Sequence, residues 1–232
     1  GKLTAGGANT ITVLGNWDSS AGAFSYGTST VNLTGTGNLK SNSSPSDTWT
    51  VKFYNLNLAA STKTTTIQSH IVFSHVVTVG AGTVTDDTSD FKLIARLGSG
   101  DHTPVVITTG ATVSIYGIAY NPTSASSTIS MEDGNYGSAR IEVRGGETGQ
   151  TFNLTGSVTT TSGFLIQSQD GASNTFNTQG YGMTIGSSFT IGWSTGDTGT
   201  NTINFGSSTV SVGNSFQVQS NAGSHNLNLG SS

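Results

Sequence analysis

One four-residue motif, in which polar and apolar residues alternate, recurs along the whole chain of 232 residues. The first copy is Thr10–Val13, and the next is Thr30–Leu33. Alternation with a period of two predicts a strand that buries one face. A strand repeated at near-constant spacing is typical of a repeat architecture. The copies begin at Thr10, Thr30, Thr50, His70, Asp90, Thr112, Thr128, Thr151, Thr175, Thr202 and Asn226.

Each repeat in the second half of the chain contains two further apolar pairs. After Thr175 these are Met183/Ile185 and Phe189/Ile191. Gly, Ser and Asn separate the pairs and suit tight corners. The sequence therefore predicts an all-β fold, a right-handed parallel β-helix (β-solenoid) of about ten three-strand coils, as a single domain over residues 1–232. An antiparallel β-sandwich is the alternative, because short, evenly spaced strands also suit that class. The pairs after Thr202 are Val210/Val212 and Phe216/Val218.

The composition narrows the classes of partner. Charged residues make up only 9% of the chain, against about 25% in an ordinary domain. Eight basic residues against twelve acidic ones form no basic stripe, so we expect no nucleic-acid partner. We expect no membrane insertion either, because no apolar run has membrane length. A cysteine-free chain rich in small polar residues suits an extracellular or cell-surface location.

Three segments carry a resemblance to a known group of proteins. They are Gly15–Trp17, Phe24–Gly37 and Phe53–Leu58. These segments resemble the β-solenoid repeat regions of large secreted prokaryotic surface and adhesin-like proteins. The close resemblance covers about the first sixty residues, and a weaker form of the same pattern covers the rest. It implies a cell-surface or extracellular fibre, often adhesive, and no particular ligand.

Charged residues near one predicted corner are the first candidates for chemistry. Two of the aspartates there could perform acid–base catalysis on a polysaccharide. Asp also favours solvated turns, and neither a loop of alternating acidic ligands for Ca²⁺ nor a paired-histidine spacing for Zn²⁺ occurs. We therefore expect no enzyme, no metal and no cofactor, with a polysaccharide-processing enzyme as the less favoured alternative. The residues are His70, His75, Asp86, Asp87, Asp90, Lys92 and Arg96.

Aromatic and Thr residues suggest two further surfaces. Trp17, Trp49 and Trp193 could stack on sugar rings, or else fill corners and close the core. A column of the repeat's Thr residues, with an Asn-rich column beside it, could form a flat ice-binding array. The same columns could be purely structural, because Thr favours strands and Asn forms side-chain ladders. Tyr120, Tyr136 and Tyr181 are the tyrosines considered with the Trp residues.

The two ends of the predicted solenoid are candidates for assembly. An open coil leaves backbone groups unpaired, so we expect head-to-tail stacking into a homopolymer. Excision from a longer array is the alternative explanation. The sequence thus predicts a structural extracellular filament or surface-fibre subunit with an adhesive role towards cell-surface glycans. A carbohydrate-binding fibre or phage tail-spike domain is the alternative. The predicted interface consists of Leu3, Thr4, Ile11, Val13, Leu227 and Leu229.

Overall fold

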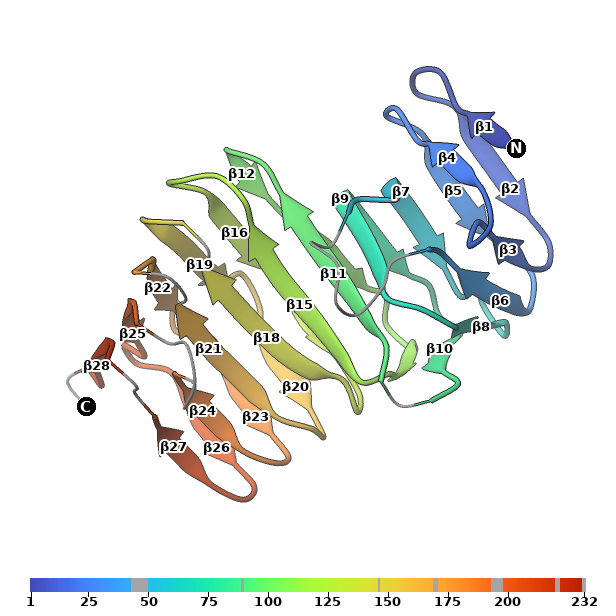
Figure 1. Ribbon diagram of the computed structural model, residues 1–232. Helices are drawn as coiled ribbons and strands as arrows, with labels where there is room; N and C mark the ends of the chain where they lie inside the picture. The colour runs from blue at the N-terminus through green and yellow to red at the C-terminus, as the bar shows by residue number, and fades with distance from the viewer. Residues whose placement is uncertain are drawn as a thin grey trace.

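The computed structural model describes residues 1–42, 50–88, 90–145, 147–168, 171–192, 198–219 and 222–230. These residues form a parallel β-solenoid of about nine turns, with the N-terminus at one end of the stack and the C-terminus at the other (Figure 1). All strand pairs in this part of the chain are parallel, and it contains no helix, hence none that could span a membrane. The predicted parallel solenoid is confirmed.

One sheet runs the length of the molecule and is called the long sheet. It has 11 strands, all but one of them in a single row from the first coil to the last. In order they are β2 (Thr10–Val13), β5 (Thr30–Leu33), β7 (Phe53–Leu58), β9 (Ile71–Val79), β11 (Lys92–Leu97), β15 (Gly117–Pro122), β18 (Arg140–Gly145), β21 (Phe164–Ser168), β24 (Phe189–Ile191) and β27 (Phe216–Val218), with β13 (Val105–Ile107) paired to β9.

The other sheets each serve one part of the stack. The N-half sheet contains β3 (Trp17–Asp18), β6 (Gly37–Lys40), β8 (Thr64–Ile67), β10 (Thr83–Asp86) and β14 (Thr112–Ser114). The ladder sheet contains β12 (Asp101–His102), β16 (Thr128–Met131), β19 (Gln150–Leu154), β22 (Ser173–Asn177), β25 (Thr200–Asn204) and β28 (Ser224–Asn228). The short sheet contains β17 (Gly134–Asn135), β20 (Val158–Thr160), β23 (Met183–Ile185) and β26 (Val210–Val212), and β1 (Lys2–Thr4) pairs with β4 (Ala23–Ser25).

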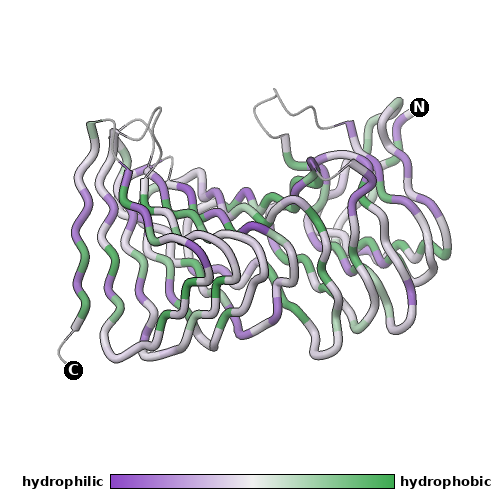
Figure 2. The backbone as a smooth tube through the Cα atoms, turned by 90° about the horizontal axis from the view of Figure 1, so that it is seen from below, coloured by the Kyte–Doolittle hydropathy of each residue, from purple (hydrophilic) through white to green (hydrophobic). Residues whose placement is uncertain are grey.

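Columns of apolar side chains fill the interior of the stack. Phe164, Phe189 and Phe216 lie in register on neighbouring strands, with ring centroids 5.5 Å and 5.2 Å apart and edge-to-face geometry. One core cluster extends from Trp17 to Phe205. The tube view shows the coils side by side, with hydrophobic and hydrophilic residues alternating along the strands (Figure 2). Period-two alternation thus places one face of most strands inside, as predicted.

Glycine permits the tightest corners. Gly137 has a φ of 57°, and a Cβ there would lie only 1.9 Å from the carbonyl oxygen of Val113 in the preceding coil. Any other residue would need both a left-handed backbone and a displaced neighbour. The corner therefore requires glycine.

In the C-terminal half, the predicted register is confirmed. Thr128, Thr151, Thr175 and Thr202 lie opposite one another, and Asn226 continues the row. The further apolar pairs predicted after Thr175 and Thr202 form β23, β24, β26 and β27. The regular repeat of this half was therefore readable from the sequence.

In the N-terminal half, the register predicted from the repeat is partly wrong. Thr10 lies opposite Thr30 as expected, but Thr30 lies opposite Asn55 and not Thr50. Thr112 pairs with Thr83 in the N-half sheet and does not follow Asp90. The displacement from Thr50 to Asn55 is five residues, so the row continues in Phe53–Leu58 and not in the predicted Thr50–Phe53. Alternation alone therefore does not fix the register.

The predicted single column of Thr residues is also wrong. Thr10 and Thr30 belong to the long sheet, whereas Thr128 and its successors belong to the ladder sheet. The two rows consequently lie in different sheets. This division removes the continuous Thr array on which an ice-binding face would depend.

Candidate functional site: a charged cluster on the outer face of the long sheet

The outward side chains of the long sheet form rows that cross several coils. In one row, Val72, Ile94 and Ala119 lie in register and make a small apolar cluster that is fully buried. Val51 packs against this cluster. The next member of the row is Glu142, which is only 1% exposed. A carboxylate is thus buried on the outer face, beside an apolar patch.

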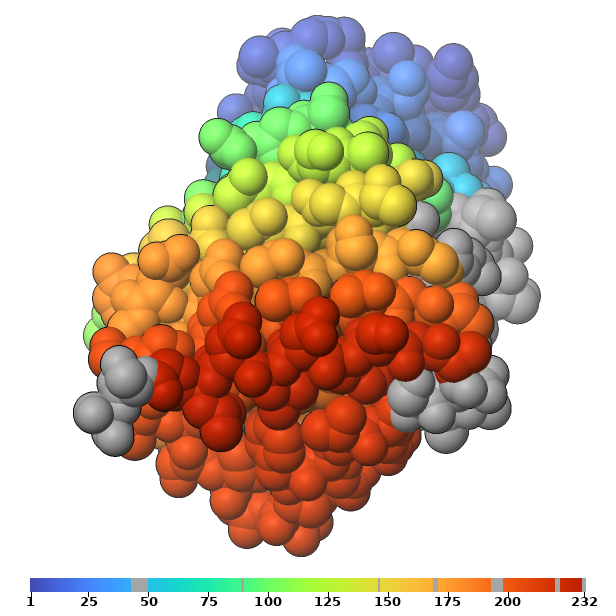
Figure 3. Space-filling view, turned by 90° about the vertical axis from the view of Figure 1, so that its left-hand side faces the viewer, coloured from blue at the N-terminus to red at the C-terminus, as the bar shows by residue number. Residues whose placement is uncertain are grey.

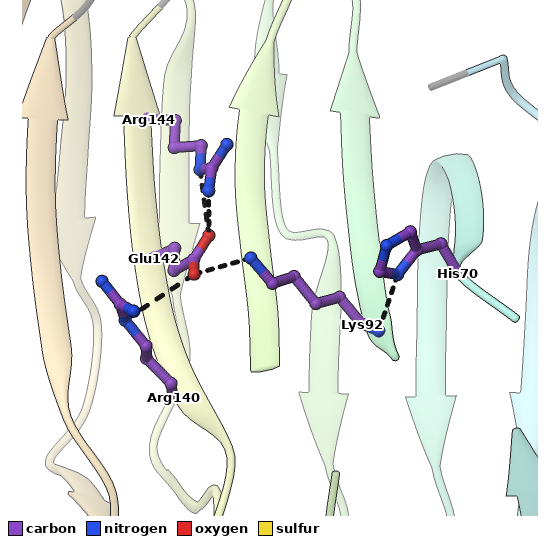
Figure 4. Close-up of polar contacts among 5 residues, drawn as sticks. All are labelled: His70, Lys92, Arg140, Glu142 and Arg144. Carbon is purple, nitrogen blue, oxygen red and sulfur yellow. Dashed lines mark hydrogen bonds and ion pairs between the residues drawn. The ribbon is translucent and has the colours of Figure 1, made fainter. Parts of the chain in front are cut away.

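Three cationic side chains surround Glu142 (Figure 4). Its Oε1 lies 2.7 Å from Lys92 Nζ and 3.6 Å from Arg140 Nε. Its Oε2 lies 2.6 Å from Arg144 Nη2 and 2.9 Å from Arg144 Nε. Alternation on β18 places Arg140 and Arg144 on either side of Glu142 on the same face. The cluster therefore has three positive charges around one negative charge.

Small residues on β15 allow Lys92 to reach Glu142. Lys92 belongs to β11 and Glu142 to β18, and β15 lies between them. At Gly117 on β15, a Cβ would lie 3.5 Å from Lys92 Cγ and 3.0 Å from the carbonyl oxygen of Arg140. The lysine stem lies over this glycine, and its Nζ is 5.1 Å from the centroid of the Tyr116 ring. The buried ion pair depends on a glycine that sequence spacing alone does not mark.

Burial and charge act against each other on the two partners. Burial opposes ionisation of Glu142, but Arg144, Lys92 and Arg140 outweigh it and hold the pKa of this carboxyl below its ordinary value. Burial lowers the pKa of Lys92 even though Glu142 favours its charged form. The neighbouring cations thus favour the charged form of Glu142, whereas burial acts against the charged form of Lys92.

His70 packs at the edge of this cluster as a neutral ring. Its Nδ1 accepts a hydrogen bond from the backbone N–H of Lys92 at 3.1 Å, and the residue is buried. Burial, followed by the charge of Lys92, lowers the pKa of His70. A ring nitrogen that accepts a hydrogen bond carries no proton, so this contact requires the neutral ring.

Two adjoining pockets line the side of the stack next to the cluster. The first pocket has a volume of about 300 Å³ and is lined in part by Tyr116 and Arg140. The second has a volume of about 490 Å³ and is lined in part by Arg140 and Gln217. Arg140 and Ser162 line both. We call the two together the lateral groove. Its other lining residues are Asp86, Ser114, Ile115, Ser138, Gly163, Phe164, Leu165, Ser187, Ser188, Thr190 and Gln219.

Two of the aspartates considered for catalysis, Asp86 and Asp87, accept hydrogen bonds at corners. Asp86 Oδ2 accepts hydrogen bonds from the backbone N–H groups of Phe91 at 3.3 Å and Tyr116 at 3.0 Å. Asp87 Oδ2 accepts one from Gln68 Nε2 at 3.1 Å. Across the described ranges, no three His, Cys, Asp or Glu side chains gather as a metal would need. These contacts favour the structural interpretation of the acidic corner.

The remaining residues of that predicted group also have structural contacts. His75 stacks on Tyr54 with ring centroids 4.6 Å apart, and its Nδ1 lies 2.7 Å from Asn55 Oδ1. Arg96 lies on β11, where alternation with buried Ala95 places it on the outer face of the long sheet. Of the predicted group, Lys92 and His70 therefore meet at the cluster, and Asp86 lies beside it through its bond to Tyr116.

The aromatic residues considered for sugar stacking are mostly interior. Trp17 is buried, with ring centroids 4.9 Å from Phe24 and 5.9 Å from Phe53. Tyr120 and Tyr136 are fully buried, and their hydroxyls lie 3.4 Å apart. These positions favour a core role for all three rings. Of the others, Tyr181 is exposed, whereas Trp49 and Trp193 lie outside the described residues.

The predicted assembly residues lie at the two ends of the stack. Leu3 and Thr4 are exposed on β1, and Leu229 is exposed just after β28. Phe216 and Val218 were not among the predicted interface residues. They have the inward pattern but are 45% and 51% exposed because they belong to the last coil. Half-buried positions at the ends are Ile11, Val13 and Leu227.

The charged cluster was also missed, although the sequence contains one signal for it. Residues 140–144 read Arg-Ile-Glu-Val-Arg, so three charges alternate with two apolar residues in a chain that has few charges. Three ionic side chains on one face of a strand could have indicated a site. The sequence gives no reason to assign Lys92 to the same site, because Lys92 is 50 residues from Glu142 along the chain.

Comparisons with protein-family models, with curated proteins and with solved structures return no match for this chain.

Proposed function

We propose that this chain is a structural segment of an extracellular fibre, and that copies of it stack end to end through their outermost coils. Catalysis has no part in this proposal. The observation that supports it most is that strand edges and core-type side chains lie open at both ends of the stack.

At the C-terminal end, the last strand of each sheet pairs on one side only within the described residues. These strands are β26, β27 and β28. Their inward side chains, which neighbouring coils bury elsewhere, are partly exposed here. Figure 3 looks onto this end, with the last coil towards the viewer. The side chains are Val210, Val212, Phe216, Val218 and Leu227.

At the N-terminal end, β2 is the edge of the same long sheet of which β27 is the opposite edge. Its inward residues Ile11 and Val13 are half-buried, against full or near-full burial of Val31 and Leu33 one coil later. Because all strands are parallel, β2 of one copy can pair with β27 of another without reversing direction. Exposed edges of this kind are templates for further strands.

The apolar side chains at the two edges also correspond. Phe216 and Val218 on β27 would face Ile11 and Val13 on β2 in the same two-residue pattern that joins β2 to β5. The junction would then continue the interior columns of both copies. A contact between unlike ends does not close on itself and propagates into a filament.

A charge placed at the edge tests this proposal. Val218→Lys puts a hydrated ammonium group where the next coil would stack, a device that blocks edge pairing. We expect the unchanged chain to form rods whose length rises with concentration, seen by sedimentation velocity and electron microscopy. The Val218→Lys chain should remain monomeric.

The matched control is Thr184→Lys, which adds the same charge at an exposed outward position of β23. It should assemble like the unchanged chain. Monomers of the unchanged chain at its highest soluble concentration, or equal assembly of both lysine variants, would contradict end-to-end stacking.

A further inference from the structure

The lateral groove combines features that suit one class of ligand. It runs beside the long sheet from Tyr116, next to β15, to Gln217 on β27. The strand order β15, β18, β21, β24, β27 gives four strand spacings, or about 19 Å. A groove of that length along the axis of the stack fits an extended chain rather than a single small molecule.

Most polar groups that line the groove are hydroxyls and amides held by neighbours. Ser188 Oγ lies 2.8 Å from Ser215 Oγ, which also accepts a hydrogen bond from Gln217 Nε2 at 2.8 Å. Gln219 Nε2 donates to Gln217 Oε1 at 2.8 Å. Groups ordered in advance lose little rotamer freedom when a ligand binds. Rows of such donors and acceptors match the hydroxyl groups of a sugar chain.

An aromatic ring lies at one end of the groove. Tyr116 is 40% exposed, and its backbone N–H is fixed by the carboxylate of Asp86. Lys92 Nζ lies 5.1 Å from the centroid of its ring. An amphipathic ring of this kind offers an apolar surface to the C–H face of a sugar and a hydroxyl to its rim.

The arginines of this face offer contacts to an anionic sugar chain. The whole chain has a net charge of −4, yet all three of its arginines lie on the outer face of the long sheet. Around Glu142, three cations face one carboxylate. One of these cations, Arg140, lines both halves of the groove, and the carboxylate of Asp86 lines the first half only. A guanidinium is suited to carboxylate and sulfate groups.

We propose that the lateral groove binds an extended acidic polysaccharide, with Arg140 contacting its carboxylate or sulfate groups. Glu142 has a positioning role: its contact with Arg140 Nε at 3.6 Å orients the guanidinium beside the groove. The neighbouring hydroxyls and amides contact the sugar hydroxyls, and the Tyr116 ring stacks on one sugar. This site lies on the side of the rod and does not depend on end-to-end stacking.

Titration calorimetry of the full chain with defined probes tests this site. The probes are an oligogalacturonate, a sulfated dextran, neutral dextran and poly-L-glutamate. We expect an acidic glycan to bind and neutral dextran to bind at least about tenfold more weakly, because the charge-assisted contact is lost. Preference between the first two probes shows whether carboxylate or sulfate is the recognised group.

Three variants make the test specific. Arg140→Gln should weaken acidic-glycan binding about tenfold. Lys63→Gln removes the same charge from an exposed position in the N-terminal half and should change affinity less than about twofold. Gln217→Glu, which leaves the charged cluster untouched, should also weaken binding because it places an anion in the second half of the groove, whose described lining has none.

Four results would overturn the proposal. They are no binding of either acidic glycan, equal losses in Arg140→Gln and Lys63→Gln, unchanged binding in Gln217→Glu, and binding of poly-L-glutamate as tight as that of the glycans. The last result would assign the groove to acidic peptides. The second variant in the groove keeps the test decisive should Arg140→Gln unfold.

Discussion

Two outward faces of the same solenoid satisfy their polar side chains in opposite ways. On the ladder sheet, Asn177 Nδ2 donates to Asn153 Oδ1 at 2.8 Å, and Asn204 Nδ2 donates to Asn177 Oδ1 at 2.7 Å. Asn228 continues the same row by donating to Asn204. The long sheet has one such rung, from Asn57 to Asn32. Among its described residues, Glu142 and its three cations occur once and combine residues from two non-adjacent strands. One face repeats a neutral unit, and the other concentrates charge.

The asparagine ladder is a feature that every coil can share, whereas the charged cluster marks a single position along the rod. An asparagine ladder can be extended by every added coil, because each amide donates to one neighbour and accepts from the other. A charged cluster cannot be repeated at the same spacing without bringing like charges together. We therefore expect the ladder to contribute evenly to stability, and the cluster to contribute strongly at one place.

Removal of the central carboxylate should cause the largest loss of unfolding free energy. Glu142→Ala leaves Lys92, Arg140 and Arg144 close together without their common partner, and breaking a buried ionic network costs about 3–5 kcal/mol. Urea unfolding followed by circular dichroism would measure it. Glu147→Ala, at an exposed position in the same region, should change the unfolding free energy by less than about 0.5 kcal/mol. Similar losses in both variants would show that the cluster contributes nothing special.

Removal of one asparagine from the ladder should lower the unfolding free energy by less. The loss should depend on the position of that asparagine in the ladder. Asn177→Ala removes one donated and one accepted hydrogen bond, worth about 1–2 kcal/mol together. Asn228→Ala removes a single bond at the last described rung and should cost about half as much. The same unfolding measurement compares the two. A larger loss at Asn228 than at Asn177 would contradict an evenly distributed ladder.

Acidification should lower the unfolding free energy through Glu142, and we expect this effect to be the smallest of the three. The pKa of Glu142 is lower in the folded chain, so its stabilisation is complete above the ordinary glutamate pKa of about 4.3 and is lost as pH falls through the folded value. Unfolding free energies from pH 6 to pH 3 should therefore fall more steeply in the unchanged chain than in Glu142→Gln. Asn177→Ala should keep the steep dependence. Parallel curves for the unchanged chain and Glu142→Gln would exclude the carboxylate as the titrating group.

How much the sequence could predict differs between the two faces. The row from Thr128 to Thr202, with the Asn row beside it, was readable because every copy keeps the same alternation and similar spacing. The cluster was not readable, because Lys92 reaches Glu142 only by lying over Gly117 on an intervening strand. Such a contact depends on which strands become neighbours.

The sequence by itself determined an all-β chain whose strands each have one apolar face, and its repeat favoured a parallel β-solenoid over an antiparallel sandwich. Only the tertiary structure decided the register of the N-terminal half. There Thr30 lies opposite Asn55, five residues beyond Thr50, and the pairing of β7 with β9 is irregular between Phe53 and Asn55. Alternation along the sequence specifies neither feature. The tertiary structure likewise decided which charges meet, because stacking brings Lys92 and Glu142 together across 50 residues of chain.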